Sequence, residues 1–143
     1  MADKITLLNH FFQDVYKRRQ LDRVPAYFTK RATINGLLPD LVFSPADLRE
    51  LIASQIDRMA QIEGEITQEL AQDNCLTARV SLHCIEAETS TPATLNGLVT
   101  ARFSADTKIS EAYFALDFLS FFEQLGQLPR NALPLLLTGA AIK

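Results

Sequence analysis

The spacing of apolar residues changes along the chain, from helical spacing in the N-terminal part to alternation from Gly64 onward. Apolar side chains at every second position are typical of half-buried strands, because successive side chains point to opposite faces of a sheet. Short polar stretches divide the alternating region. The pattern predicts strands at Glu65–Gln72, Cys75–Ala87, Leu95–Ala105 and about Ile109–Leu116, paired as an antiparallel meander.

The N-terminal part predicts helices. Apolar residues recur at helical spacing from about Asp3 to Arg19, namely at Leu8, Phe11, Phe12 and Val15. A short helix at Val24–Thr29 and a brief strand at about Arg31–Leu37 are expected next. Helices followed by a meander of strands place the chain in the α+β class.

A capping motif opens the clearest helix of the sequence. Ser44 supplies an N-cap hydroxyl, Pro45 suits the first helical position, and Asp47 stands where a capping box has its acid. An apolar stripe continues to about Gln61, with Gln55 as its one polar interruption. The stripe comprises Leu48, Leu51, Ile52, Ile56 and Met59.

Composition limits the classes of function. The 143 residues fit one domain, 1–143, with a single core. The 14 basic and 17 acidic residues leave a net charge of −3, which does not indicate a nucleic-acid partner. The N-terminus lacks the apolar core of a signal peptide and no apolar run approaches the ~20 residues of a membrane span, so we expect a cytoplasmic protein. The apolar tail Leu133–Leu137 is expected in the core or at an interface.

The cysteines and histidines show no metal-ligand spacing, and no metal site is predicted. Cys75 and Cys84 fall in one predicted strand, roughly 30 Å apart and on opposite faces. Bridged cysteines have Cα atoms within about 7 Å of each other, so we expect two buried free thiols.

The segment Ile109–Pro129 joins a strand to a short apolar helix. Its most specific parts are Ile109-Ser110-Glu111-Ala112-Tyr113, then Asp117, and then Gln124-Leu125-Gly126. With the order of elements along the chain, this segment resembles the SnoaL-like polyketide cyclases, in their ester-cyclase-like branch, of the nuclear transport factor 2-like superfamily. Tyr113 stands where that family usually has tryptophan.

The resemblance implies a fold and a range of functions. The fold is a cystatin-like conical barrel, in which N-terminal helices pack in a strongly bent antiparallel or mixed sheet, with a short C-terminal helix. It implies an apolar cavity and a homodimer formed through the outer face of the sheet. Members with known activity cyclise or isomerise small carbonyl compounds by proton transfer without a metal or organic cofactor, and many others only bind a ligand or a protein.

One position departs from the family pattern. Cyclases of this family carry a catalytic aspartate directly after the strand aromatic, where this chain has Phe114. A phenyl ring can line a cavity, but it cannot transfer a proton. The resemblance therefore does not supply the catalytic acid.

Two residues are candidates for acid-base chemistry. Asp117 could face the cavity mouth as an acid or base, or could serve as the N-cap of the following helix, for which aspartate is a preferred residue. His83 has an ordinary pKa near neutrality and could act as a base. It shares its predicted face with Arg79 and Ser81, so a surface or interface histidine is the alternative.

Alternation also indicates which side chains face the interior. The apolar faces comprise Leu76, Ala78, Val80, Leu82 and Cys84 in one strand, Leu95, Gly97, Val99, Ala101 and Phe103 in the next, and Ala112, Phe114 and Leu116 in the last. Tyr16, Tyr27 and Asn35 could offer hydrogen bonds to a ligand, or could serve packing alone. With Phe114 they form the predicted ligand-binding set.

The first hypothesis is a dimeric protein that binds a small hydrophobic molecule in an apolar cavity, with a cyclase or isomerase activity on a hydrophobic carbonyl compound as its catalytic form. The alternative is a non-catalytic protein-interaction or dimerisation module that uses the polar sheet face and the tail Leu133–Leu137.

Overall fold

The computed structural model describes residues 2–139. Its single five-stranded sheet has the order β1-β5-β4-β3-β2. β1 runs parallel to β5, and all other neighbours are antiparallel. The strands are β1 (Phe28–Asn35), β2 (Met59–Gln72), β3 (Cys75–Glu86), β4 (Pro92–Phe103) and β5 (Ile109–Leu116). The predicted meander is confirmed, and the brief strand expected at about Arg31–Leu37 is β1, which begins earlier, at Phe28, and lies at the edge beside β5.

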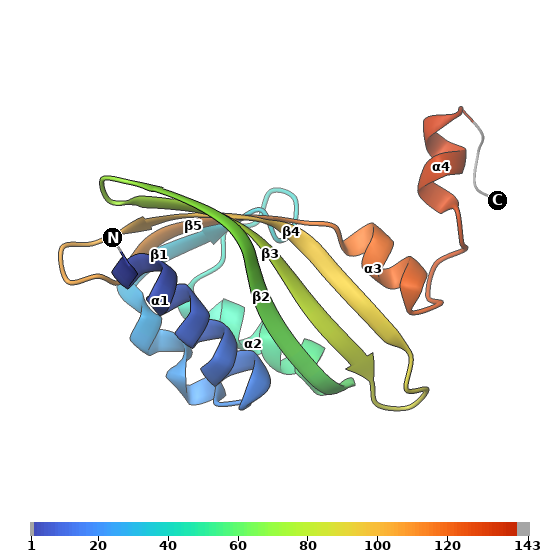
Figure 1. The fold of residues 1–143 in the computed structure, drawn as a ribbon, viewed down its shortest axis with the longest axis horizontal. Helices are drawn as coiled ribbons and strands as arrows, with labels where there is room; N and C mark the ends of the chain where they lie inside the picture. The colour runs from blue at the N-terminus through green and yellow to red at the C-terminus, as the bar shows by residue number, and fades with distance from the viewer. Residues whose placement is uncertain (1, 140–143) are drawn as a thin grey trace.

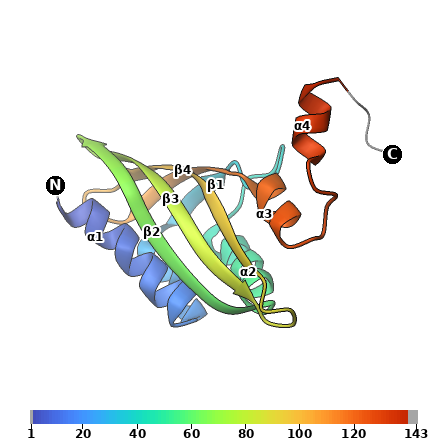
Figure 2. The ribbon, with the colours of Figure 1, turned by 45° about the vertical axis from the view of Figure 1, so that its right-hand side comes forward.

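The helices flank this sheet. They are α1 (Ala2–Phe11), the π-helix η1 (Phe12–Lys17), the 3₁₀-helix η2 (Leu21–Tyr27), α2 (Pro45–Ile56), α3 (Phe118–Gln124) and α4 (Ala132–Leu137). Figures 1 and 2 show the sheet arching over α1 and α2, with α4 projecting away from the body. The predicted α+β fold, a strongly bent mixed sheet around N-terminal helices, is confirmed.

The predicted capping box opens α2. The Ser44 hydroxyl accepts a hydrogen bond from the Asp47 N–H at 3.1 Å, and the Asp47 carboxylate accepts one from the Ser44 N–H at 3.0 Å. The predicted extension of this helix to Gln61 is wrong, because α2 ends at Ile56.

The strand predicted to begin at Glu65 instead begins at Met59. Met59 and Ile62 are buried on the inner face and pair with Glu86 and Cys84 at the end of β3. Ladder hydrogen bonds and burial on the sheet therefore outweigh the helical spacing of Met59. Two register shifts in β2, between Met59 and Gln61 and between Ile66 and Gln68, mark bulges of the kind that bend a strand.

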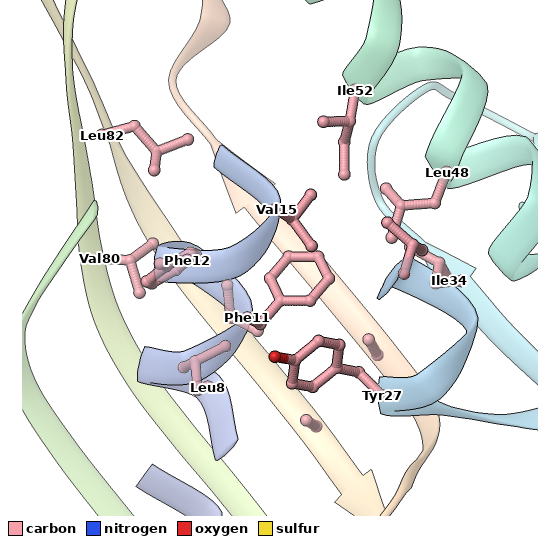
Figure 3. Packing of buried hydrophobic residues seen from close by; sticks show 14 of the residues in the cluster. Leu8, Phe11, Phe12, Val15, Tyr27, Ile34, Leu48, Ile52, Val80 and Leu82 are labelled. Carbon is pink, nitrogen blue, oxygen red and sulfur yellow. The ribbon is translucent and has the colours of Figure 1, made fainter. Parts of the chain in front are cut away.

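The inner faces of the strands are buried as predicted. In β3, Leu76, Ala78, Val80, Leu82 and Cys84 are buried, and Thr77, Arg79 and His83 are exposed. Figure 3 shows Phe12 beside Val80 on the sheet, with Phe11 and Val15 turned toward the other helices. The N-terminal helical segment therefore fills the concave side of the sheet.

The apolar tail does not join this core. Residues 132–137 form α4, in which only Ala132 is buried and Leu137 is 77% exposed. The core placement expected for Leu133–Leu137 is wrong, and its use at an interface stays a prediction. The homodimer through the sheet also stays a prediction, although Leu98 and Tyr113 are exposed on the outer face. Within residues 2–139 no helix is long and apolar enough to cross a membrane.

A glycine in β2 allows the helical segment to approach the sheet closely. A Cβ atom added at Gly64 would lie 2.7 Å from both Cβ and Cγ of Phe12. Contacts that short force one of the two elements to move. Gly64 therefore lies inside the strand rather than before it, and its missing side chain sets the separation of η1 and β2.

We expect Gly64→Ala to lower the free energy of unfolding by about 1–3 kcal/mol, because the added methyl overpacks the contact with Phe12. Denaturant unfolding of wild type, Gly64→Ala, Phe12→Ala and the double variant measures the coupling. A smaller cost of Gly64→Ala in the Phe12→Ala background is expected. Phe12→Ala removes the ring but keeps Cβ, so the same cost in both backgrounds would show that the contact with the ring is not the cause.

Candidate functional site

A cavity of about 180 Å³ lies between the sheet and the helices, where β2 begins, β3 ends and β4 begins. Most of its lining is apolar, and its charged member is Arg58. Helical segments supply Tyr16, Ser54, Gln55, Phe121 and Phe122, the strands supply Met59, Ile62, Leu82, Cys84 and Leu95, and Arg58 and Leu125 lie just after α2 and α3.

The sheet wall follows from strand register. Cys84 of β3 pairs with Ile62 of β2, and Leu82 pairs with Leu95 of β4. All four side chains lie on the inner face and are buried. Alternation therefore gathers apolar side chains from three strands into one continuous wall.

Tyr16 belongs to the π-helical segment η1. The Arg18 N–H donates to the Gln13 carbonyl at 2.9 Å, which is the five-residue spacing of a π turn. Single π turns occur frequently at functional sites. The Tyr16 ring lies 6.1 Å from the rings of both Phe11 and Phe12, and its hydroxyl has no hydrogen-bond partner within residues 2–139.

A second residue of η1, Asp14, attaches this segment to η2 through its carboxylate. The Asp14 carboxylate accepts a hydrogen bond from the Tyr27 hydroxyl and forms ion pairs with Arg18 at 3.1 Å and Arg23 at 3.5 Å. The hydrogen bond from Tyr27, followed by the charge of the two arginines, lowers the pKa of Asp14. Asp14 thus stays ionised and holds η1 against η2.

Arg19 connects the end of η1 to the turn between α2 and β2. Its backbone has a positive φ of 58°, and its guanidinium donates to the carbonyls of Ile56, at 2.9 Å, and Met59. These carbonyls flank the turn between α2 and β2, which contains Arg58. The end of η1 is thereby joined to the segment that carries the charged residue of the cavity.

Apart from Arg58, the titratable groups of the described cavity lining, Tyr16 and Cys84, are neutral near pH 7. Burial, with a smaller effect of Cys84, raises the pKa of Tyr16, and burial raises the pKa of the Cys84 thiol to about 11. Both groups therefore keep their protons and can donate hydrogen bonds. The described lining contains no carboxylate and no imidazole that could act as a general base.

The two predicted acid-base residues lie away from this lining. Asp117 is exposed and caps α3, since its carboxylate accepts a hydrogen bond from the Ser120 N–H at 3.0 Å. His83 is exposed on the outer face, where its ring lies 3.2 Å from the Thr94 hydroxyl and 3.8 Å from the Glu65 carboxylate. The structure does not bring Asp117 and His83 together.

Of the predicted ligand-binding set, only Tyr16 lines the cavity. Phe114 is half-buried and packs against the core. Tyr27 is buried and donates its hydroxyl hydrogen bond to Asp14. Asn35 lies in a separate surface hollow beside Tyr113.

Several lining residues were not singled out from the sequence. Gln55 interrupts the apolar stripe of α2, and that polar position was the available signal. Phe121 and Phe122 belong to a helix whose apolar surface required cover. Arg58 had no such signal, and Met59 was predicted in the helix rather than in a strand, because their place depends on where α2 stops and β2 begins.

The two expected buried thiols differ in the structure. Both cysteines are free, but Cys75 is half-buried and only Cys84 is buried. Cys84 faces the cavity, whereas Cys75 lies at the far end of β3. The expectation is therefore correct for Cys84 and wrong for Cys75.

Comparisons with known proteins show what the chain is similar to. No protein-family model and no curated protein matches its sequence. Among solved structures, AclR from Streptomyces galilaeus, provisionally described as a hydroxylase, matches with a TM-score of 0.76 at 17% identity, over 90% of this chain and 99% of that one.

Other similar structures carry cyclase names. A protein from Shewanella denitrificans OS-217, provisionally named a SnoaL-like polyketide cyclase, matches with a TM-score of 0.71 at 9% identity, over 87% of this chain and 98% of its own. One from Bacillus cereus ATCC 10987, provisionally named a polyketide cyclase, matches with a TM-score of 0.75 at 17% identity, over 88% and 82%. The chain has the fold of the SnoaL-like proteins, which confirms the resemblance at the level of structure.

We expect Cys84 to resist alkylation in the folded protein. A rise of its pKa from 9.0 to about 11 leaves about a hundredfold less thiolate at pH 8. Iodoacetamide labelling followed by peptide mass spectrometry should modify Cys75 well before Cys84, and denaturant should remove the difference. Equal native rates would contradict the burial of Cys84.

The same pKa shift predicts a pH dependence of stability. The unfolded thiol ionises near its ordinary pKa of 9.0, while the folded thiol stays protonated at that pH. Its stabilising contribution is complete below that pH and is lost as pH rises toward about 11. Wild type should therefore lose more stability than Cys84→Ala between pH 8.5 and 10.5, measured by denaturant unfolding; equal losses would contradict this assignment.

We expect Asp117→Asn to leave stability unchanged, since asparagine caps helices as well as aspartate does, and Asp117→Ala to cost about 1 kcal/mol. Thermal unfolding of both variants measures this. If Asp117 instead carries a proton in a reaction, Asp117→Asn abolishes turnover while the fold is retained.

Proposed function

We propose that this protein binds a small, mainly apolar molecule in the cavity and donates a hydrogen bond from Tyr16 to a carbonyl or hydroxyl oxygen of that ligand. The observation that carries this proposal is a neutral tyrosine hydroxyl, without a partner in the described chain, in a cavity of otherwise mainly apolar lining. A hydrogen bond contributes about 0.5–1.5 kcal/mol, and an oxygen on the ligand supplies the acceptor that the Tyr16 hydroxyl lacks in the described chain.

The volume limits the size of the ligand. Pockets for drug-sized molecules span about 300–1,000 Å³, whereas a cavity of about 150 Å³ binds benzene. The volume of about 180 Å³ therefore suits one ring or a short chain, with any further substituent extending through the mouth. A rigid polycyclic ligand does not fit without rearrangement of the lining.

We also propose that the protein catalyses a cyclisation or isomerisation of the bound ligand. Similar structures named polyketide cyclases support it, although at identities of 9% and 17% they carry over the fold alone. A neutral tyrosine can polarise a carbonyl and stabilise a developing enolate. Because the described lining has no general base, such a reaction would suit a substrate that brings its own acidic C–H group and nucleophile.

We expect Tyr16→Phe to weaken the binding of a carbonyl compound about tenfold, the value of one hydrogen bond, while leaving a hydrocarbon of the same shape unaffected. Acetophenone and isopropylbenzene are a suitable pair, titrated by ligand-observed NMR. Tyr113→Phe is the matched control, because Tyr113 is exposed on the outer sheet face.

The proposal has two points of failure. Absence of saturable binding for both probes would reject the cavity as a ligand site. If Tyr16→Phe weakens the binding of both probes equally, the cavity remains a ligand site but the hydrogen bond from Tyr16 is rejected.

A further inference from the structure

The charged residue of the cavity is not engaged by the protein. Arg58 is exposed, lines the cavity, and takes part in no side-chain hydrogen bond or ion pair with residues 2–139. Arg18 and Arg23 pair with Asp14, and Arg19 donates to backbone carbonyls. Arg58 thus combines an unpaired guanidinium with a place at the cavity.

The backbone of Arg58 is held although its side chain is not. The Arg58 carbonyl accepts a hydrogen bond from the Ala87 N–H at 3.0 Å, and Arg19 binds the carbonyls of Ile56 and Met59 on either side. Such a fixed backbone holds the base of the Arg58 side chain beside the cavity. Less order then has to be created when a ligand binds.

From this arrangement we infer that the ligand is a monocarboxylic acid, whose carboxylate pairs with Arg58 while its apolar part lies among the leucines and phenylalanines of the cavity. The inference rests on the proposed function and specifies its ligand class. A guanidinium and a carboxylate match in shape and form paired, charge-assisted hydrogen bonds. The apolar lining explains why the rest of the acid should be uncharged.

A single negative charge fits better than two. Arg58 also borders a second hollow of about 440 Å³ with Asp57, Glu86 and Glu88, and none of these carboxylates forms an ion pair with it. These carboxylates repel a doubly charged group such as a phosphate more strongly than they repel a carboxylate.

Matched probes test the inference. Benzoate and benzamide have the same shape and differ in charge, and both are titrated by ligand-observed NMR against wild type, Arg58→Gln and Arg31→Gln. Arg31→Gln is the control, because Arg31 is exposed on β1 outside the cavity lining. We expect wild type and the control to bind benzoate about tenfold more tightly than benzamide, and Arg58→Gln to lose that preference.

Further measurements keep the result interpretable. Added NaCl should weaken the binding of benzoate to wild type but not the binding of benzamide. This measurement does not depend on the folding of a variant. Equal binding of the two probes, or a preference for benzoate retained in Arg58→Gln, would overturn the inference that Arg58 binds a carboxylate. Either result would leave the cavity as a proposed ligand site. If phenyl phosphate binds as tightly as benzoate, the inference that the ligand carries a single negative charge is wrong. Absence of saturable binding of both benzoate and benzamide would overturn this inference, and absence of acetophenone binding as well would reject the proposed function.

Discussion

The contact of Phe12 with Gly64 determines how the rest of the molecule is arranged. A helix normally keeps its distance from a sheet because side chains of both stand between them, but Gly64 contributes none. Phe12 can therefore rest on the backbone of β2, and the segment Phe12–Lys17 lies deep in the concave face. Asp14 then meets Tyr27 and the nearby arginines, and Tyr16 reaches the cavity. One missing side chain in a strand thus positions the donor on which the proposed binding depends.

Much of the fold was predictable because it depends on local patterns. Alternation gave the inner faces of β3, β4 and β5, and the capping box at Ser44 gave the start of α2. The site was less predictable because it lies where patterns change. The segment at Met59 satisfies helical and strand spacing equally well, and pairing with Glu86 decided the outcome. The π turn that carries Tyr16 has no signature in apolar spacing.

The fold of this chain does not determine its chemistry. The sheet matches proteins named as cyclases and another provisionally described as a hydroxylase, at identities too low to transfer a reaction. The family pattern would place an acid where Phe114 stands, and Phe114 packs against the core instead. Of the two predicted acid-base residues, Asp117 caps a helix and His83 lies on the outer face of the sheet. The cavity itself offers donors, with Tyr16 and Arg58 as the distinctive ones.

The size of the cavity sets the kind of function that such binding can serve. Drug-sized ligands gain about 0.3 kcal/mol per non-hydrogen atom and the best very small ones about 1.5, so a single-ring acid of about ten atoms at an intermediate value of about 0.5 gains about 5 kcal/mol. That corresponds to a dissociation constant of roughly 0.2 mM. A complex of this strength exchanges its ligand rapidly, which suits turnover or the sensing of an abundant metabolite better than storage. The turn that carries Arg58 is held by hydrogen bonds from Arg19 and Ala87, so the charged side of the site is in place before a ligand arrives.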